Sequence, residues 1–537
     1  MNDQPADVLI AAEARAGAPE GAPRLSGEFI RQALLSKVEI PADCPLTVDD
    51  RGARLEGAII EGELDLSAAG FDRPIIFERC TFAQPIVLTR AKLDHLSILK
   101  SRAPGLLAQF AEFHGGLDLR GTWLDSPDSI ALNGEGIRVG NSVWLSDGFV
   151  STGTVVLRDS QINHALFCMG GKIQIKHPLA ATRSTEGPTR IEGLAIYALG
   201  AAIGYVLLTA CQISGLAGFV SASVRGNFGV IGSSLTSGGL LLTHTEIGGS
   251  LIFARVEAFE GLLDLTGVNA KGLVEDGSIW ADSKTGKPRP GVRMYLEDLR
   301  YADFVSVEFA LMDMDWRKRL AWLKAQPAEL LSAEFVSQPF TQCASVLREK
   351  GDAHGAKMIL FEREQLRLKA KHVGFWEKAG GHILGVLAGH GYKTERALYW
   401  AIGVWILGGL IFGVADYLGE MRPADPHILV EHEYQETLRP PTDYEPVNPL
   451  LYSADILLPV VELGQQEYWI PRNAGEHIAD VDHAFPNLAR GLRDTIAWLF
   501  SGWLPKAYYY FEIFMGWLLV SIVIAGFSGL LGHAKEE

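Results

Sequence analysis

The chain has 537 residues, 48% of them hydrophobic, so it can bury a large core and carry further domains. Its 48 Lys and Arg residues stand against 64 Asp and Glu residues, and the net charge of −16 disfavours general affinity for nucleic acid or for anionic membrane surfaces. The five cysteines are scattered without a C-x-x-C pair, which argues against a disulfide scaffold or a zinc cluster and suits a reducing compartment.

The N-terminal residues 1–24 lack the basic region and long apolar run of a secretory signal. Their Ala, Pro, Gly and Glu content predicts a disordered lead. Residues 25–49 follow with "SGEFIRQALLSKV", in which Ser26 is placed to cap a short amphipathic helix. Because the open end of a stacked coil needs a cover, we expect this helix to cap a repeat domain.

A six-residue phrase recurs across residues 50–272, for example as "GGLLLT" at Gly238, "GSLIFA" at Gly249 and "GLLDLT" at Gly261. Neighbouring copies are often 11 or 12 residues apart, and the third and fifth positions are always apolar. These positions hold Leu64 and Leu66, Leu117 and Leu119, Val143 and Leu145, Val155 and Leu157, Val206 and Leu208, Ala217 and Phe219, Phe228 and Val230, Leu240 and Leu242, Leu251 and Phe253, and Leu263 and Leu265.

Such alternation predicts short strands with one buried face. A strand this short cannot bury its apolar face alone, whereas strands stacked at a fixed repeat share one continuous core. Two strands per turn give a coil of roughly 22 residues, so we predict a parallel β-solenoid over residues 50–272. An antiparallel sandwich has similar strand spacing but gives no reason for the phrase to be repeated.

The phrase G-x-L-D-L-[SR], together with "ARLEGAIIEGELDLSAAG" (residues 53–70), resembles the repeats of bacterial pentapeptide-repeat and related right-handed parallel β-helix proteins. The resemblance implies a mainly β fold, a right-handed parallel β-helix followed by a C-terminal two-span region. The spacing departs from multiples of five. Relatives of this type are sometimes loosely labelled membrane-associated oxidoreductases, but this chain has no G-x-G-x-x-G after a strand and no cysteine pair.

A connector over residues 273–334 leads to a helical segment, residues 335–396. Apolar and charged residues mix there in the pattern of a half-buried helical hairpin, broken at Gly351–Asp352 and continued by an interfacial helix. The turn "LREKGD" resembles the helical segment that joins solenoid to membrane in a group of bacterial proteins. That resemblance implies a rigid adaptor.

Two uncharged runs follow, residues 397–415 and residues 513–532. At about 1.5 Å per residue, each is long enough to cross a hydrocarbon core of about 30 Å, and both predict transmembrane helices. Each run also carries small residues that would let helix backbones approach closely, within the chain or between chains. These helix-packing candidates are Gly409, Gly413, Ser521, Ala525 and Gly529.

Charge predicts the orientation of the two spans. Basic residues precede the first span, whereas residues 416–507 hold fifteen acidic and six basic residues. The basic side should be cytoplasmic. We therefore expect a bacterial inner-membrane protein with its solenoid and its tail, residues 533–537, in the cytoplasm and its loop, residues 416–512, outside. Lys393 and Arg396 are expected near lipid phosphates at the membrane interface.

The loop contains an apolar stretch within residues 448–471 that is too short to span but long enough for a re-entrant helix. Span, re-entrant helix, span is the topology that two-span cation channels have. If several chains assembled around an axis, rings of Asp455 or Glu462 beside Gly464 could select cations. The alternative is an amphipathic segment on the outer leaflet with Glu462 solvated.

Candidate acids on the solenoid, such as Asp65, Asp118 and Asp264, are scattered rather than stacked on consecutive coils. They predict no acid–base pair, and we expect no catalytic residue, no cofactor and no metal site. The favoured function is a non-enzymatic integral membrane protein whose solenoid is a scaffold or recognition module. Its expected partners are the lipid bilayer and a partner protein or a second copy of the chain. The alternatives are an oligomeric ion-channel-like pore and a β-helix enzyme acting on a polymer.

Overall fold

The computed structural model divides into two compact units, Met1–Ala370 and Lys371–Glu537. The structure describes residues 16–127, 129–178, 194–282, 287–305, 315–393, 395–437, 440–473, 489–501 and 503–527.

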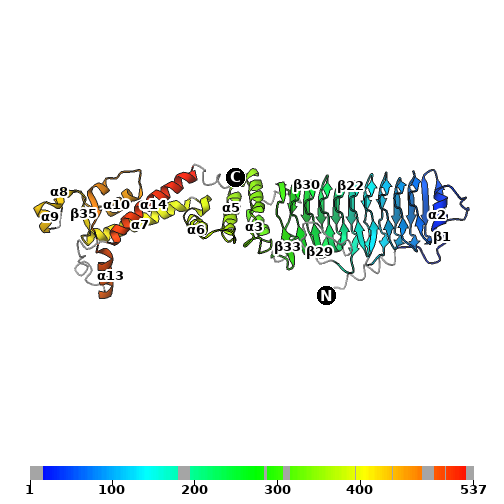
Figure 1. Ribbon diagram of the computed structural model, residues 1–537, viewed down its shortest axis with the longest axis horizontal. Coiled ribbons are helices and arrows are strands. Elements are labelled where there is room, and N and C mark those ends of the chain that lie inside the picture. The colour runs from blue at the N-terminus through cyan, green and yellow to red at the C-terminus, as the bar shows by residue number, and fades with distance from the viewer. Residues whose placement is uncertain are drawn as a thin grey trace. The chain divides into compact units, whose positions relative to one another are not determined.

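The first unit contains a solenoid of parallel strands, with about nine turns in residues 53–275 (Figure 1). Its strands form two sheets, each of 17 strands in the described part of the chain. Among these strands only β2 and β3 pair antiparallel, and every pairing between successive coils is parallel. The predicted parallel solenoid is confirmed, and the antiparallel sandwich is excluded.

The first sheet contains β1 (Arg24–Ser26), β4 (Ile59–Glu61), β5 (Leu64–Asp65), β8 (Thr81–Phe82), β9 (Ile86–Val87), β12 (Arg102–Ala103), β13 (Leu106–Leu107), β16 (Trp123–Leu124), β17 (Ile130–Asn133), β20 (Val150–Ser151), β21 (Thr154–Val156), β23 (Lys172–Gln174), β24 (Leu194–Tyr197), β26 (Gln212–Gly218), β29 (Ser234–Leu241), β31 (Ala258–Asp264) and β33 (Val292–Tyr295). The second contains β2 (Leu46–Asp49), β3 (Gly52–Glu56), β6 (Gly70–Phe71), β7 (Ile75–Glu78), β10 (Lys92–Leu93), β11 (Leu96–Leu99), β14 (Glu112–Phe113), β15 (Leu117–Asp118), β18 (Arg138–Val139), β19 (Val143–Trp144), β22 (Gln161–Met169), β25 (Ala202–Thr209), β27 (Ser223–Val224), β28 (Phe228–Ile231), β30 (Glu246–Ala254), β32 (Asn269–Glu275) and β34 (Arg300–Phe304).

The core of the solenoid is the column of apolar residues that the repeated phrase predicts. All twenty residues at the third and fifth positions of the phrase are at most 2% exposed. Equivalent residues stack on one another in successive coils, as Val206 does on Phe228 and Phe228 on Leu251. Apolar area removed from water in this way is the main stabilising contribution, roughly 25 cal/mol per Å².

The fourth position of the phrase helps to hold the corner of the coil. Asp65 Oδ1 accepts a hydrogen bond from Ser67 N at 2.8 Å, and Asp264 Oδ1 accepts one from Thr266 N at 2.9 Å. The chain then turns through a left-handed residue, as at Ala68 with φ 56°. The hydrogen bonds from Ser67 lower the pKa of Asp65. This side-chain bond to the backbone two residues on is a known way in which Asp stabilises a turn.

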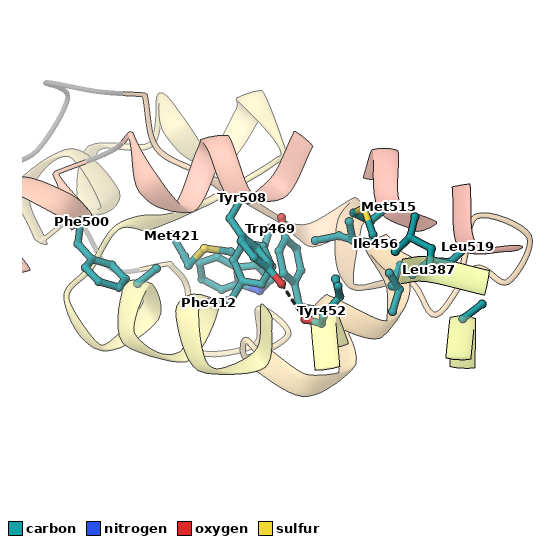
Figure 2. Packing of buried hydrophobic residues seen from close by; sticks show 14 of the residues in the cluster. Leu387, Phe412, Met421, Tyr452, Ile456, Trp469, Phe500, Tyr508, Met515 and Leu519 are labelled. Atoms are coloured by element: carbon teal, nitrogen blue, oxygen red, sulfur yellow. Dashed lines mark hydrogen bonds between the residues drawn. The ribbon is translucent and has the colours of Figure 1, made fainter. Parts of the chain in front are cut away.

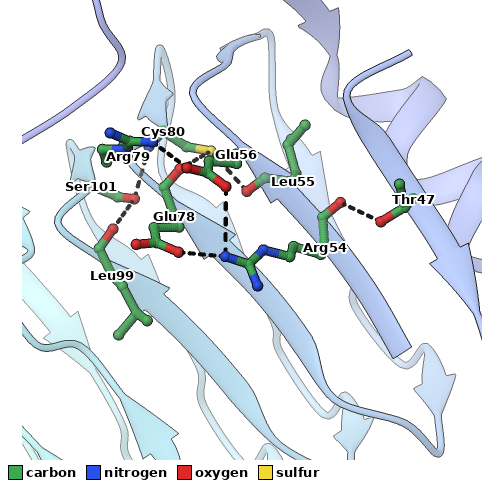
Figure 3. A network of polar contacts seen from close by, with 9 residues as sticks. All are labelled: Thr47, Arg54, Leu55, Glu56, Glu78, Arg79, Cys80, Leu99 and Ser101. Carbon is green, nitrogen blue, oxygen red and sulfur yellow. Dashed lines mark hydrogen bonds and ion pairs between the residues drawn. The ribbon is translucent and has the colours of Figure 1, made fainter. Parts of the chain in front are cut away.

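A serine side chain satisfies backbone groups inside another corner, where an unpaired N–H would be costly. Ser101 Oγ accepts from Cys80 N at 3.0 Å and donates to Leu99 O at 2.8 Å (Figure 3). On the outer surface of the same coils, Arg54 pairs with Glu78 at 2.9 Å. Because both partners are partly solvated, such a pair contributes at most about 1 kcal/mol. The buried column and the hydrogen bonds inside the corners, rather than surface charge, define the coil.

The N-terminal end of the solenoid begins earlier than predicted. The predicted disordered lead lies outside the described residues up to residue 15, but Gly17 N donates to Lys100 O at 2.9 Å and β1 pairs in parallel with β4. The predicted capping helix is α2 (Gly27–Leu34), and Ser26 Oγ accepts from Phe29 N at 3.1 Å. Gly27 lies so close to the first coil that a Cβ there would be 2.1 Å from Glu63 O.

The C-terminal end of the solenoid also extends beyond the predicted boundary at residue 272. Strands β33 and β34 pair in parallel with β31 and β32, so part of the predicted connector belongs to the solenoid. A helix that was not predicted, α3 (Trp316–Leu323), follows.

The helical hairpin is confirmed as α4 (Gln338–Glu349) and α5 (Ala353–Arg367), with the break at Gly351, whose φ is 90°. Its first helix is joined to the last coil by two glutamine side chains. Gln338 Nε2 donates to Leu299 O at 3.0 Å, and Gln342 Nε2 donates to Tyr301 O at 2.6 Å. The hairpin is therefore attached to the solenoid through hydrogen bonds to its backbone.

The second unit contains the two long apolar helices. Its elements are α6 (Phe375–Ala388), the 3₁₀ turn η1 (Gly389–Gly391), α7 (Glu395–Tyr417), β35 (Met421–Pro423), α8 (Pro426–Leu429), α9 (His432–Thr437), α10 (Pro449–Leu457), α11 (Gln465–Tyr468), β36 (Trp469–Pro471), α13 (Arg490–Phe500) and α14 (Leu504–Phe527). Strands β35 and β36 pair antiparallel.

Helices α7 and α14 are long and apolar enough to cross a membrane. The first predicted span, residues 397–415, lies within α7. The second predicted span, residues 513–532, begins within α14, which starts earlier, at Leu504, and includes Glu512. A search for uncharged runs stops at a single acid, whereas a helix can continue through an acid that is buried in a polar contact. Residues 528–532 of that prediction lie outside the described part of the chain.

Candidate functional site

Three helices of the second unit, α7, α10 and α14, pack around a cluster of aromatic side chains (Figure 2). The ring of Phe412 lies 4.8 Å from the ring of Tyr452 and 5.9 Å from that of Tyr508. The hydroxyl of Tyr508 donates to Val404 O at 2.7 Å. Tyr508 is buried between the helices.

A glutamic acid is buried where these helices meet. Glu512 of α14 is 0% exposed, and its Oε1 lies 2.5 Å from the hydroxyl oxygen of Ser453 on α10. The same hydroxyl lies 2.9 Å from the backbone oxygen of Trp405 on α7. Glu512 Oε2 and the Tyr452 hydroxyl are buried without a hydrogen-bond partner among the residues that the structure describes. We call Glu512, Ser453 and the Trp405 carbonyl the buried acid site.

Gly408 makes room for this site. A Cβ at position 408 would lie 2.3 Å from Ser453 Oγ and 2.6 Å from Glu512 Oε1. The site also lies well inside both long helices. At 1.5 Å per residue, Gly408 is about 20 Å from the start of α7, and Glu512 is about 12 Å from the start of α14. A charged or chargeable group at such a position in an apolar helix marks a candidate functional site.

The residues predicted for a pore lie elsewhere. Asp455 is buried, and its two carboxylate oxygens accept from Leu463 N at 2.7 Å and from Gln466 N at 2.8 Å. It therefore holds the turn that follows α10. Glu462 in that turn is exposed, and Gly464 precedes α11 with a φ of 83°.

The small residues predicted for helix packing fall into two groups. A Cβ at Gly409 would lie 2.4 Å from Leu450, and one at Gly413 would lie 3.5 Å from Pro449, so both glycines face α10 of the same chain. On α14, Ser521 is exposed and donates to Trp517 O of its own helix at 2.7 Å. Ala525 is half-buried, and Gly529 lies outside the described residues.

The basic residues predicted at the membrane interface are near the junction of α6 and α7. Arg396 Nη1 donates to Gly385 O at 3.3 Å, and the backbone N–H of Lys393 donates to Ala388 O at 3.2 Å. Both side chains are half-buried. Arg396 therefore contributes directly to the contact between the two helices.

Sequence reasoning missed Glu512, Ser453 and Gly408. The signal for Glu512 was a single acid between two apolar aromatic stretches, in "YYYFEIFMGW". Ser453 and Gly408 gave no separate signal in the sequence. Ser453, for example, lies 59 residues away from its partner Glu512.

A second polar cluster lies at the C-terminal end of the solenoid, beside a cavity of about 660 Å³. Glu275 and Arg319 form a buried pair at 3.4 Å. Trp280 Nε1 donates to Glu275 Oε1 at 2.8 Å, and Gly277 N donates to the same oxygen at 2.5 Å. Burial raises the pKa of Glu275 to about 7, although Arg319 and the hydrogen bonds lower it.

This shift predicts a pH dependence of stability. The folded-state pKa of Glu275, about 7, lies above the value of about 4.3 expected in the unfolded chain. Between pH 4.3 and pH 7, roughly, the folded protein holds a proton on Glu275 that unfolding releases. The free energy of unfolding should therefore fall as the pH rises through this range and level off above about pH 7. In Glu275→Gln the decline should be smaller, as measured by the midpoint of thermal unfolding from pH 4.5 to pH 8.

The matched control is Glu257→Gln, because Glu257 lines the same cavity but is exposed. Its profile should follow that of the unaltered protein. Identical profiles for all three proteins would contradict the assigned titration of Glu275.

No protein-family model, no curated protein and no solved structure matches this chain.

Proposed function

We propose that this protein is a non-enzymatic membrane protein in which the second unit is the anchor and the β-solenoid is a scaffold or recognition module. The observation that carries the proposal is the outward face of the two long helices. Leu410 on α7 is 62% exposed, and Phe514 and Trp517 on α14 are 64% and 59% exposed. In the apolar stretch of each helix, only 28% is buried in α7 and only 33% in α14, whereas the core helix of a water-soluble protein is mostly buried.

The lengths of the helices support the same proposal. Helices of 23 and 24 residues are about 35 Å long, enough to cross a hydrocarbon core of about 30 Å. Exposed apolar surface of this extent in water would cause association, whereas in lipid it is solvated. Phe375 and Trp376 at the start of α6 are 75% and 83% exposed, and aromatic side chains of this kind are enriched at membrane interfaces.

The solenoid supports a scaffold better than an enzyme. Acids that could have served in catalysis are used to hold its corners, as Asp118 does by accepting from Arg120 N at 3.1 Å and pairing with its guanidinium at 2.7 Å. The stacked coils offer a long, regular surface on which a protein partner can bind. The proposed location is the inner membrane of a bacterium, with the solenoid in the cytoplasm, because the basic flank of α7 precedes the span.

Cysteine labelling tests both the anchor and its orientation. The cysteines of the chain all precede residue 344, and Cys44 is the one that is partly exposed, since Cys80, Cys168, Cys211 and Cys343 are buried. In intact spheroplasts, a membrane-impermeant maleimide should label Glu462→Cys in a Cys44→Ser background. The unaltered protein should be labelled at Cys44 only after lysis.

The opposite labelling pattern would reverse the proposed orientation. Release of the unaltered chain from membranes by alkaline carbonate would overturn the anchor itself. Ion flux through liposomes containing a purified oligomer, lost on Glu462→Gln, would favour the pore over the scaffold.

A further inference from the structure

We infer that the buried acid site binds a proton: Glu512 is a neutral carboxylic acid that donates a hydrogen bond to Ser453 in the folded protein. The position of this proton at membrane depth rests on the proposed function, whereas its presence follows from the contacts alone.

The contacts of Ser453 carry the inference because its hydroxyl has one hydrogen. This hydroxyl lies within hydrogen-bonding distance of two oxygens, Trp405 O at 2.9 Å and Glu512 Oε1 at 2.5 Å. If Glu512 were ionised, both of these oxygens would be acceptors. One of the two short contacts would then join two oxygens with no hydrogen between them.

A proton on Glu512 resolves this conflict. Glu512 then donates to Ser453 Oγ, and Ser453 donates to the Trp405 carbonyl, so each short contact holds one hydrogen. The distance of 2.5 Å is at the short end of the range for O–H···O hydrogen bonds. The chain of two hydrogen bonds joins α14 to α10 and α10 to α7.

Among the described residues, a negative charge on Glu512 would have the Ser453 hydroxyl as its single hydrogen-bond donor. No Lys, Arg or His of the described residues forms an ion pair with Glu512, and Oε2 has no hydrogen-bond partner among them. Tyr508, one turn earlier on α14, already uses its hydroxyl hydrogen on Val404 O. A buried carboxylate without a partner costs several kcal/mol, so the neutral form is favoured.

The number of oxygens favours a proton over a metal ion. The site brings together one carboxyl group, one hydroxyl and one carbonyl, whereas Mg²⁺ takes about six oxygen ligands and Ca²⁺ about six to eight. The part of the chain that the structure describes contains no group of three or more His, Cys, Asp or Glu residues placed to hold a metal ion. The chemical class of the ligand is therefore a proton.

Infrared spectroscopy of the full-length protein in detergent at pH 7 tests the inference. A difference spectrum between the unaltered protein and Glu512→Gln should show the C=O stretching band of a protonated carboxylic acid, present only in the unaltered protein. In Ser453→Ala the band should remain but move to higher frequency, because the hydrogen bond to the hydroxyl is lost. Any protonated Glu275 contributes equally to both spectra and cancels.

The matched control is Glu462→Gln, an exposed acid of the same unit, which should leave the band unchanged. If Glu512→Gln does not fold, the Ser453→Ala shift still assigns the band.

A spectrum without the Glu512 band would overturn the inference. So would loss of the band when sodium replaces choline in the buffer, since a cation would then take the place of the proton. Neither outcome depends on the labelling pattern, so failure of this inference is distinguishable from failure of the anchor.

Discussion

Gly204→Ala is expected to destabilise the solenoid strongly. A Cβ at this position in β25 would lie 1.9 Å from His164 O and 2.7 Å from Asn163 O. Both atoms belong to the backbone of the preceding coil. Because that coil is hydrogen-bonded to its neighbouring coils, neither atom can move aside alone. Overpacking of a rigid core typically costs about 1–3 kcal/mol and occasionally more. We expect a cost near 3 kcal/mol, which lowers the midpoint of thermal unfolding by roughly 5–10 °C.

Gly70→Ala is the matched control for this prediction. Gly70 also lies in a solenoid strand, β6, but a Cβ there would meet no atom within 4 Å and its φ is not in the left-handed region. Its midpoint should stay close to that of the unaltered protein, as followed by circular dichroism of the full-length chain in detergent. Equal melting of the two variants would show that the coils are not packed as closely as described.

The repeated phrase predicted the interior of the solenoid well because burial in a stacked coil is local. Each phrase specifies its own inward residues, and the same positions are buried in every coil. The ends were predicted less well because they do not use the phrase. Strands β33 and β34 read "VRMY" and "RYADF", and they belong to the solenoid only through their pairing with β31 and β32.

The Asp at the fourth position shows another limit of the repeat pattern. Alternation along a strand turns Asp118 and Asp264 away from the apolar column. Both residues are nevertheless buried, because each folds back on the backbone of its own corner. Alternation predicts the direction in which a side chain points, but it does not predict the local hydrogen bonds to the backbone that bury it.

The buried acid site could not be predicted because its contacts are distant in sequence. Hydropathy found α7 and most of α14, but it placed the start of the second span directly after Glu512 and so treated this acid as part of the loop. Only the packing of α10 between the two long helices brings Ser453 to Glu512. The glycines that allow this packing, Gly408 and Gly516, look in sequence like many other glycines of membrane helices.

Gly516→Val is expected to separate α10 from α14 and to open the buried acid site. A Cβ at position 516 would lie 2.4 Å from Leu457 O at the end of α10, and helices in lipid associate largely through close packing of this kind. Because Leu457 O is a backbone atom, α10 must move as a whole. We therefore expect the free energy of unfolding to fall by about 3 kcal/mol or more. Gly403→Val in α7 is the control, since a Cβ there meets nothing within 4 Å. The monodisperse fraction and the thermal midpoint of the detergent-purified protein measure the effect. If the two valine variants behave alike, α10 is not packed against α14, and the contact between Ser453 and Glu512 loses its structural basis.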